Sequence, residues 1–131
     1  MAVDIKTLRI GSHVEYDGKR VRVALVRDDG CICEYKDNGQ DVIVGLGIEK
    51  QPIPITPELL AELGFVNTSS SRRITYTKGS EYEDLWIEVR NLKDRWEVFV
   101  SDNNWDGRIV CRYLHEAELF LVLHNIELVK D

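Results

Sequence analysis

The chain has 131 residues, of which 44% are hydrophobic and 31% are charged. This balance is typical of a folded globular protein with one core or two small ones, and it excludes an intrinsically disordered chain. Seventeen Lys and Arg stand against 23 Asp and Glu, so the formal net charge is −6. General nucleic-acid binding depends on neutralising phosphates, so this charge argues against that class and leaves a specific partner open.

The sequence carries no sign of export or of a membrane span, and this predicts a cytoplasmic location. Residues 1–6 lack the basic start and the apolar run of a secretory signal. No apolar run approaches the roughly 18 residues that a bilayer-spanning helix needs. The three cysteines are an odd number without the pattern of a disulfide framework, which fits a reducing compartment.

Turn dipeptides divide the first part of the chain into short runs rich in β-branched and aromatic residues. Asp17-Gly18, Asp29-Gly30 and Asn38-Gly39 tolerate the positive φ angles of tight hairpin turns. The runs between and after them predict strands at 13–16, 20–26, 31–36, 41–44 and 48–53. Short strands joined in this way are typical of a small SH3-like β-barrel, which we expect over residues 1–51.

Side-chain alternation predicts which residues of this barrel are buried. Val21, Val23 and Leu25 alternate with polar or small residues and should lie on one apolar face. Cys31 and Cys33 share a face of the next strand for the same reason. A structural zinc site needs four ligands, usually in two close pairs, and the sequence offers no second pair. The two thiols are therefore expected in the barrel core.

A proline-rich segment at 51–57 separates the first part of the chain from the second. Its prolines favour an extended backbone and remove hydrogen-bond donors. Thr56 then has the side chain of an N-cap, Pro57 suits the first helical position, and Gly64 suits the left-handed position after a helix. We therefore expect a joint followed by a helix of about two turns.

The remaining residues predict a second domain, 52–131, in which a sheet lies between two helices. Alternating apolar residues predict a three- or four-stranded antiparallel sheet, with strands at 73–78, 85–89, 96–100 and 108–111. Apolar residues recur at helical spacing from Tyr113 to His124 and predict a C-terminal helix. The fold class is therefore α+β. Both helices should cover one sheet face, which is formed by Leu85, Ile87, Val89, Trp96, Val98 and Val100.

Three segments stand out by their order and spacing. They are Leu8 to Lys19 (LRIGSHVEYDGK), Pro52 to Phe65 with its PIPITPELL start and Gly-Phe end, and Tyr113 to Phe120 (YLHEAELF). Together they resemble a group of small uncharacterised proteins from anaerobic gut bacteria and from their phages and mobile elements. The resemblance covers most of the chain. It implies a shared architecture and provenance, and it implies no activity or mechanism.

Motifs that carry chemistry are few. Residues 45–47 lack the further spacing of a phosphate-binding loop, and the serines at 69–71 lack the surround of a catalytic nucleophile. No two carboxylates are singled out as an acid–base pair. His115 with Glu116 and Glu118 could transfer protons or bind a metal, but a solvated helix N-terminus explains these residues more simply. We expect no enzyme activity, no cofactor and no metal.

The expected function is a non-enzymatic adaptor or accessory role in which the chain binds another protein or itself. Large rigid aromatic side chains dominate protein interfaces, and Trp86 and Trp105 are the best candidate anchors. The apolar surface also extends around the C-terminal helix, beside a groove that His115 would border. The residues predicted for the interface are Trp86, Trp105, His115, Leu119, Val122 and Leu123.

A nucleic-acid accessory module is the alternative function. Lys19, Arg20 and Arg22 cluster around one predicted hairpin with two tyrosines nearby, and small barrels bind nucleic acids through strands of this kind. Residues 1–50 hold eight Lys and Arg against nine acids, whereas residues 51–131 hold nine against fourteen. The charge argument against nucleic acid is therefore weaker for the first part of the chain.

Overall fold

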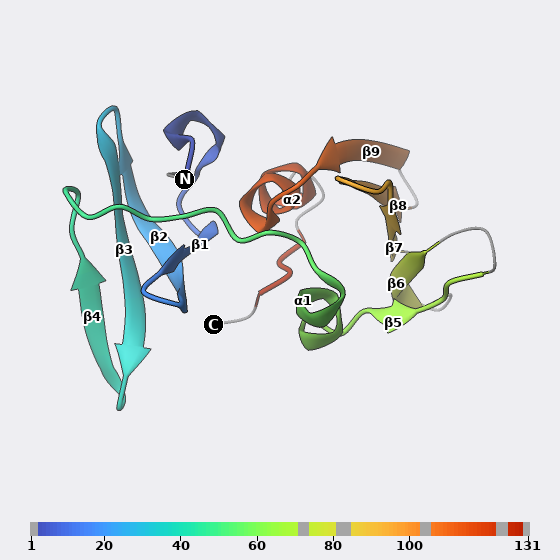
Figure 1. Cartoon of the computed structure of the whole chain (residues 1–131), viewed down its shortest axis with the longest axis horizontal. Coiled ribbons are helices and arrows are strands. Elements are labelled where there is room, and N and C mark those ends of the chain that lie inside the picture. Colours follow the sequence, from blue (N-terminus) through green and yellow to red (C-terminus); the bar gives the residue numbers. More distant parts are fainter. Residues whose placement is uncertain (1–2, 71–73, 81–84, 103–105, 123–125, 130–131) are drawn as a thin grey trace. The chain divides into compact units, whose positions relative to one another are not determined.

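The computed structural model describes residues 3–70, 74–80, 85–102, 106–122 and 126–129, and the chain forms two units (Figure 1). Unit 1 comprises Met1–Pro54 and Tyr113–Leu123, and unit 2 comprises Ile55–Arg112 and His124–Asp131. Within the described residues, each unit has one antiparallel sheet, of four strands in unit 1 and five in unit 2, and one short α-helix. The architecture is α+β, as the sequence predicts.

The sheet of unit 1 is a meander in which each strand pairs with the next along the chain. Its strands are β1 (His13–Tyr16), β2 (Lys19–Arg27), β3 (Gly30–Asp37) and β4 (Gln40–Val44). Asp17 and Gly18 join the first two strands with φ angles of 50° and 73°, and Asn38 and Gly39 join the last two with 51° and 82°. These positive angles suit a type I′ turn, so both predicted turns are confirmed.

The middle turn differs from the prediction by one residue. Arg27 pairs with Gly30, so the two turn residues are Asp28 and Asp29. Gly30 instead begins β3 and is buried. A Cβ atom there would lie 3.2 Å from the carbonyl oxygen of Leu46. The glycine therefore permits a close backbone approach and does not form the turn.

A β-bulge in β2 changes which side chains face the core. The register with β3 shifts between Val23 and Leu25, which leaves Ala24 as the extra residue. Leu25 is consequently 37% exposed, whereas Val26 packs against the core. The prediction that Val21, Val23 and Leu25 share one buried face is therefore wrong at Leu25, because an inserted residue moves every later side chain to the other face.

The strands of unit 1 form an open sheet, and no closed barrel is found in the part of the chain that the structure describes. β1 and β4 are its two edge strands. The strand expected at 48–53 is reduced to one pairing, in which Glu15 and Gln51 exchange backbone hydrogen bonds of 2.8 and 2.9 Å. The four-stranded meander is the part of the predicted barrel that the structure contains.

The core of unit 1 combines the sheet with two short helical elements. These are η1 (Ile5–Thr7), a 3₁₀ helix, and α2 (Leu114–Leu121), and α2 contacts both β1 and η1. The buried cluster on the sheet includes both thiols, as predicted. It consists of Val3, Leu8, Val14, Val21, Val23, Cys31, Cys33 and Val44.

One carboxylate attaches α2 to β1. The backbone N–H of His13 donates to Oε1 of Glu118 at 2.8 Å, and Nδ1 of His13 lies 2.6 Å from Oε2. An ionised carboxylate only accepts hydrogen bonds, so Nδ1 carries the proton. Both side chains are buried, at 4% and 11% exposure. The C-terminal helix thus belongs to unit 1, which differs from the prediction that it covers the second sheet. Its partner lies 105 residues away and leaves no local pattern in the sequence.

Hydrogen bonds also hold the segments where the chain leaves and re-enters unit 1. Within unit 1 the N–H of Leu114 donates to the carbonyl oxygen of Ile53 at 2.8 Å. Within unit 2 the N–H of Ile55 donates to the carbonyl oxygen of Arg112 at 3.0 Å. The first boundary between the units falls inside residues 51–57, the segment from which the joint is predicted.

In unit 2, α1 (Pro57–Glu62) is capped at both ends in the predicted way. Oγ1 of Thr56 accepts the N–H of Leu59 at 3.1 Å. Gly64 has a φ angle of 91°. The N–H groups of Gly64 and Phe65 then donate to carbonyl oxygens of the last turn at 3.1 and 2.9 Å. This is the Schellman pattern, which satisfies carbonyls that the helix end would otherwise leave unpaired.

The sheet of unit 2 packs one face against α1. Its strands, in spatial order, are β5 (Val66–Asn67), β6 (Thr75–Ser80), β7 (Leu85–Asn91), β8 (Trp96–Asp102) and β9 (Asp106–Cys111). Lys78 of β6 donates to the carbonyl oxygen of Leu63 after α1 at 2.8 Å, and Figure 1 shows α1 inside the curve of the sheet. The side chain of Leu85 lies outside the described residues, and the rest of the predicted face is buried, namely Ile87, Val89, Trp96, Val98 and Val100.

The division into units changes the distribution of charge. Because α2 brings Glu116 and Glu118 into unit 1, that unit has eight Lys and Arg against eleven Asp and Glu. Unit 2 has nine against twelve. Each unit therefore carries a formal charge of −3, and the first part of the chain is not the nearly neutral one that residues 1–50 suggest.

Replacing Glu118 tests how α2 is held. Glu118→Ala leaves the buried N–H groups of His13 without their acceptor, and we expect the free energy of unfolding to fall by about 3–5 kcal/mol. Glu118→Gln keeps one acceptor and should fall between Glu118→Ala and the wild type. Urea denaturation followed by circular dichroism measures these differences. The exposed Glu58→Ala serves as a control and should cost less than about 1 kcal/mol. A Glu118→Ala variant as stable as Glu58→Ala would contradict this account.

Candidate functional site

The side of the unit 2 sheet that faces away from α1 carries an exposed tryptophan. We call this side the outer face. Strand pairing aligns its side chains in three rows across the sheet. The rows are Val66, Thr77, Glu88, Phe99 and Arg108; then Thr75, Arg90, Glu97 and Val110; then Trp86, Ser101 and Asp106.

Apolar side chains on the outer face are partly open to solvent. Trp86 is 39% exposed, Val110 is 45% exposed and Val66 is 64% exposed. Phe99 is half-buried in the row that begins with Val66, which lies between the other two rows. A tryptophan that remains this open, beside further apolar side chains, is characteristic of a surface that binds another molecule. Trp105, the other predicted anchor, lies outside the described residues.

Three charged side chains of the outer face lie close together. Glu97 lies 3.7 Å from Arg90 and 3.9 Å from Arg108. The guanidinium of Arg108 also lies 5.9 Å from the centre of the Phe99 ring. These contacts compensate the two arginines locally on a partly exposed surface. The outer face therefore presents apolar anchors without an excess of positive charge.

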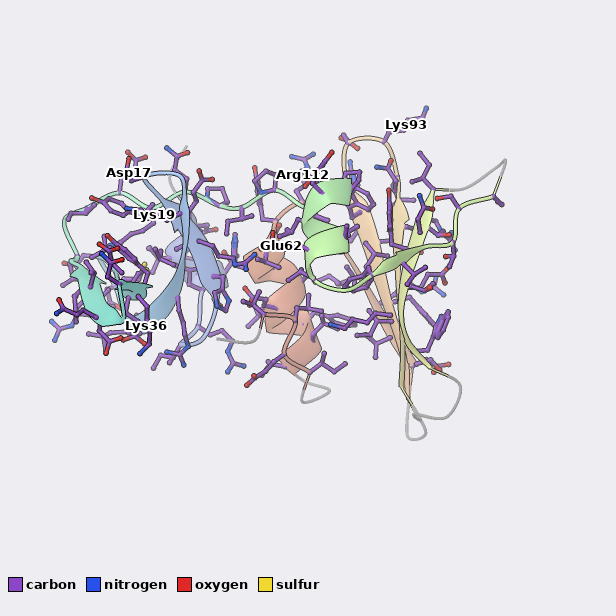
Figure 2. The ribbon with its side chains drawn as sticks, turned by 90° about the horizontal axis from the view of Figure 1, so that it is seen from below. Asp17, Lys19, Lys36, Glu62, Lys93 and Arg112 are labelled. Atoms are coloured by element: carbon purple, nitrogen blue, oxygen red, sulfur yellow. The ribbon has the colours of Figure 1, made fainter. Side chains whose placement is uncertain are left out.

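The three cations of the nucleic-acid alternative are not on one face of unit 1. Alternation along β2 places Lys19 opposite to Arg20 and Arg22. Figure 2 shows Lys19 at the β1–β2 hairpin, and its ammonium lies 5.0 Å from the centre of the Tyr35 ring. On the other face, Arg22 pairs with Glu34 at 3.1 Å. The three cations therefore lie on two different faces of the hairpin.

The predicted interface residues of α2 have different surroundings. His115 is buried at 2% exposure, so its side chain does not border an open groove. Leu119 is 39% exposed and Val122 is half-buried. Leu123 lies outside the described residues. The apolar strip predicted on this helix is therefore visible at Leu119 and Val122.

Hydrogen bonding fixes the tautomer of the buried His115. Its Nε2 lies 2.8 Å from Oγ1 of Thr7, and that hydroxyl donates to the carbonyl oxygen of Asp4 at 2.6 Å. Since the Thr7 proton is used in this way, Nε2 must donate and Nδ1 carries the lone pair. Nδ1 has no hydrogen-bond partner in the described part of the chain. Burial lowers the pKa of His115, and the charges of Glu116 and Asp4 oppose this shift only in part.

Cys31 and Cys33 form a close pair of thiols in the core of unit 1. Their Sγ atoms are 3.8 Å apart, and their exposures are 1% and 0%. The hydrogen bond from Cys33 lowers the pKa of Cys31, burial opposes this, and the charge of Lys50 adds to it. The same hydrogen bond and burial raise the pKa of Cys33. Cys31 is therefore the more acidic thiol of the pair.

A pocket of about 380 Å³ lies next to Cys31. Among its lining residues are Cys31 and Lys50. Lys50 is buried at 4% exposure, and its ammonium donates to the carbonyl oxygens of Cys31 and Gly45. The exposed residues Asp29 and Glu49 also line the pocket. The sequence pattern did not single out Lys50, because its burial depends on the path of the chain after β4.

Comparisons with known proteins add no relative. No family model, no curated protein and no solved structure matches this chain. Within the described residues, no helix is long and apolar enough to cross a membrane. The same residues contain no group of three or more His, Cys, Asp or Glu side chains placed to hold a metal ion. Inferences about function therefore depend on the sites described above.

The lowered pKa of His115 gives stability a defined pH dependence. The unfolded chain binds the proton near the ordinary histidine value of about 6.5, and the folded chain binds it only at lower pH. The stabilisation is therefore complete above about pH 6.5 and decreases as the pH falls below it, by at most about 1.4 kcal/mol per pH unit.

His115→Gln measures this contribution, because the glutamine amide can replace Nε2 in the bond to Thr7 but does not titrate. Urea denaturation from about pH 7.5 to about pH 5 should show the wild type losing more stability than the variant. Parallel pH profiles for the two proteins would rule out the buried neutral imidazole.

Proposed function

We propose that this chain is a non-enzymatic interaction protein that binds another protein, or a second copy of itself, through the outer face of unit 2. The observation that carries the proposal is Trp86, which is 39% exposed in a sheet whose opposite face is closely packed. Tryptophan is the residue most enriched among those that dominate binding energy. Phe99 lies diagonally next to it on β8, and Val110 is a further exposed apolar residue of the same face, on β9.

The charges of the outer face support a protein partner. The two arginines on this face lie close to Glu97, and the unit as a whole carries −3. A surface with apolar anchors and internally paired charges suits a protein interface, in which the centre is depleted of unpaired charge. Leu119 on α2 offers a second exposed apolar contact in unit 1.

The nucleic-acid module stays the alternative and has less support. Each unit is acidic, and Arg22 already pairs with Glu34. Affinity for nucleic acid would require these cations to leave protein partners for phosphates. The binding experiment below includes a nuclease arm that separates the two functions.

Finer attributes of the chain are proposals of the same kind. An SH3-like class for unit 1 is supported by its meander and by the pairing of Gln51 with Glu15 at the free edge of β1, where a closing strand would lie. A cytoplasmic location is supported by three buried cysteines that form no disulfide. The resemblance of the three sequence segments supports an accessory protein of phage or mobile-element origin.

Trp86→Ala tests the proposed interface. Loss of a central tryptophan costs about 2 kcal/mol or more of binding free energy, which is roughly a thirtyfold weaker complex. Sedimentation velocity over a wide concentration range detects self-association. Affinity capture from native host lysate, with and without nuclease, detects another partner. We expect the complex to survive nuclease and to be lost in Trp86→Ala.

Ile43→Ala is the matched control, because Ile43 is 65% exposed on β4 in the other unit. This variant should assemble like the wild type, and circular dichroism should show both variants folded. The proposal fails if Trp86→Ala assembles as well as Ile43→Ala does. A complex that nuclease dissolves, and that Arg20→Glu with Arg22→Glu weakens, would favour the nucleic-acid alternative.

A further inference from the structure

Lys50 is a buried cation without a buried counter-charge. Its ammonium contacts two carbonyl oxygens, and no carboxylate of the described residues forms an ion pair with it. Burying a charge in this way is costly unless an opposite charge lies nearby. Cys31 supplies one of these carbonyl oxygens, and its thiol, like that of Cys33 next to it, can become anionic. The three side chains therefore form one electrostatic unit.

The two sulfur atoms are placed to share one ion. They extend from alternate residues of β3 to the same side, and 3.8 Å separates them. A zinc–thiolate bond is about 2.3 Å long. Two bonds of this length place their sulfurs about 3.8 Å apart when the sulfur–metal–sulfur angle is tetrahedral, and about 4.6 Å apart when it is linear. Small side-chain rotations cover this range. Soft thiolate ligands select soft ions, among them copper(I) and zinc.

We propose that Cys31 and Cys33 bind one monovalent soft metal ion of the copper(I) class, with Lys50 as its buried counter-charge. Binding replaces the two S–H bonds with two metal–sulfur bonds and releases two protons. The metal keeps its oxidation state. The bis-thiolate complex then carries one negative charge, which the Lys50 ammonium compensates, so the buried group becomes neutral.

The ligand count and charge favour a monovalent ion over zinc. Zinc in structural sites takes four protein ligands, and the described residues offer no third His, Cys, Asp or Glu at this place. A zinc bis-thiolate would also be neutral, which would leave the charge of Lys50 uncompensated. Copper(I) is satisfied by two thiolates, and a buried apolar surround excludes the water that would compete with them.

A disulfide between the two cysteines fits the strand less well than a bridging ion does. Residues two apart in a strand have Cα atoms about 6.6 Å apart, near the upper end of the range for disulfides. The sulfurs would have to approach from 3.8 Å to about 2.05 Å, which would bend β3 in the centre of the sheet. A two-coordinate copper(I) ion is close to linear and needs the sulfurs to move apart by about 0.8 Å, which is a smaller change than the approach that a disulfide needs.

The pocket provides the entry path. It is partly open to solvent, and its apolar lining includes Val3, Ile5 and Leu46. The exposed acids Asp29 and Glu49 lie on the same lining and would attract a cation toward it. An ion in this pocket would lie next to Cys31, and local opening of the buried pair would let it reach Cys33, which does not line the pocket.

Anaerobic titration with copper(I) held by a chromogenic indicator ligand tests the proposal. The reduced wild type should remove one copper ion per chain from the indicator. Cys31→Ser and Cys33→Ser should each lose this ability. Lys50→Met keeps the volume of the side chain without its charge, and it should weaken the affinity by about 10-fold to 100-fold. The third cysteine supplies the matched control, since Cys111→Ser should bind copper like the wild type.

X-ray absorption at the copper edge on the wild type keeps the test independent of whether the variants fold. Two sulfur ligands around each copper ion support the site. No copper uptake, or copper bound only by nitrogen and oxygen, overturns it. Uptake that persists in folded Cys31→Ser and Cys33→Ser also overturns it. If the protein retains zinc in preference to copper(I), the assignment of a monovalent ion is overturned. If Cys31 and Cys33 form a disulfide and bind no copper, the metal site is overturned and the pair is a redox pair.

Discussion

The carboxylate of Glu118 is the constraint on which the rest of the structure depends. It accepts two hydrogen bonds from His13, one from the backbone and one from the ring, and both side chains are buried. A buried acceptor of this kind is costly to leave unpaired, so the last helix must return to the first strand. The chain therefore leaves unit 1 after Pro54 and returns to it at Tyr113, and residues 124–131 again belong to unit 2.

This connectivity has consequences for charge and for binding. The acids of α2 move into unit 1, and the two units become equally acidic. The basic residues of the first hairpin are thereby placed in an acidic unit and partly paired within it. The outer face of unit 2 keeps its apolar side chains with the charges beside them paired. A protein partner for Trp86 follows more directly from this arrangement than a phosphate backbone does.

Local signals predicted most of the elements. Asp17-Gly18 and Asn38-Gly39 form the predicted turns because their conformational preference is intrinsic to these residues. The Thr56 cap and the Gly64 stop are equally local. The bulge at Ala24 was missed, because strand alternation contains no information about an extra residue opposite a partner strand. The sequence predicted only some residues of the candidate sites. The exposure of Trp86 follows from the alternation of side chains along its strand, whereas the burial of His115 does not follow from any local pattern.

By itself the sequence determined the strand faces apart from the bulge at Ala24, two of the three hairpin turns, the caps of α1 and the α+β class, since these depend on preferences and periodicities that span a few residues. Only the tertiary structure decided which unit contains α2, what net charge each unit carries, and that Lys50 lies beside Cys31. Each of these depends on contacts between residues far apart in the chain, such as the 105-residue separation of His13 and Glu118. Local patterns do not predict such contacts, because the partner of a buried polar group is determined by which distant segments the folded chain brings next to it.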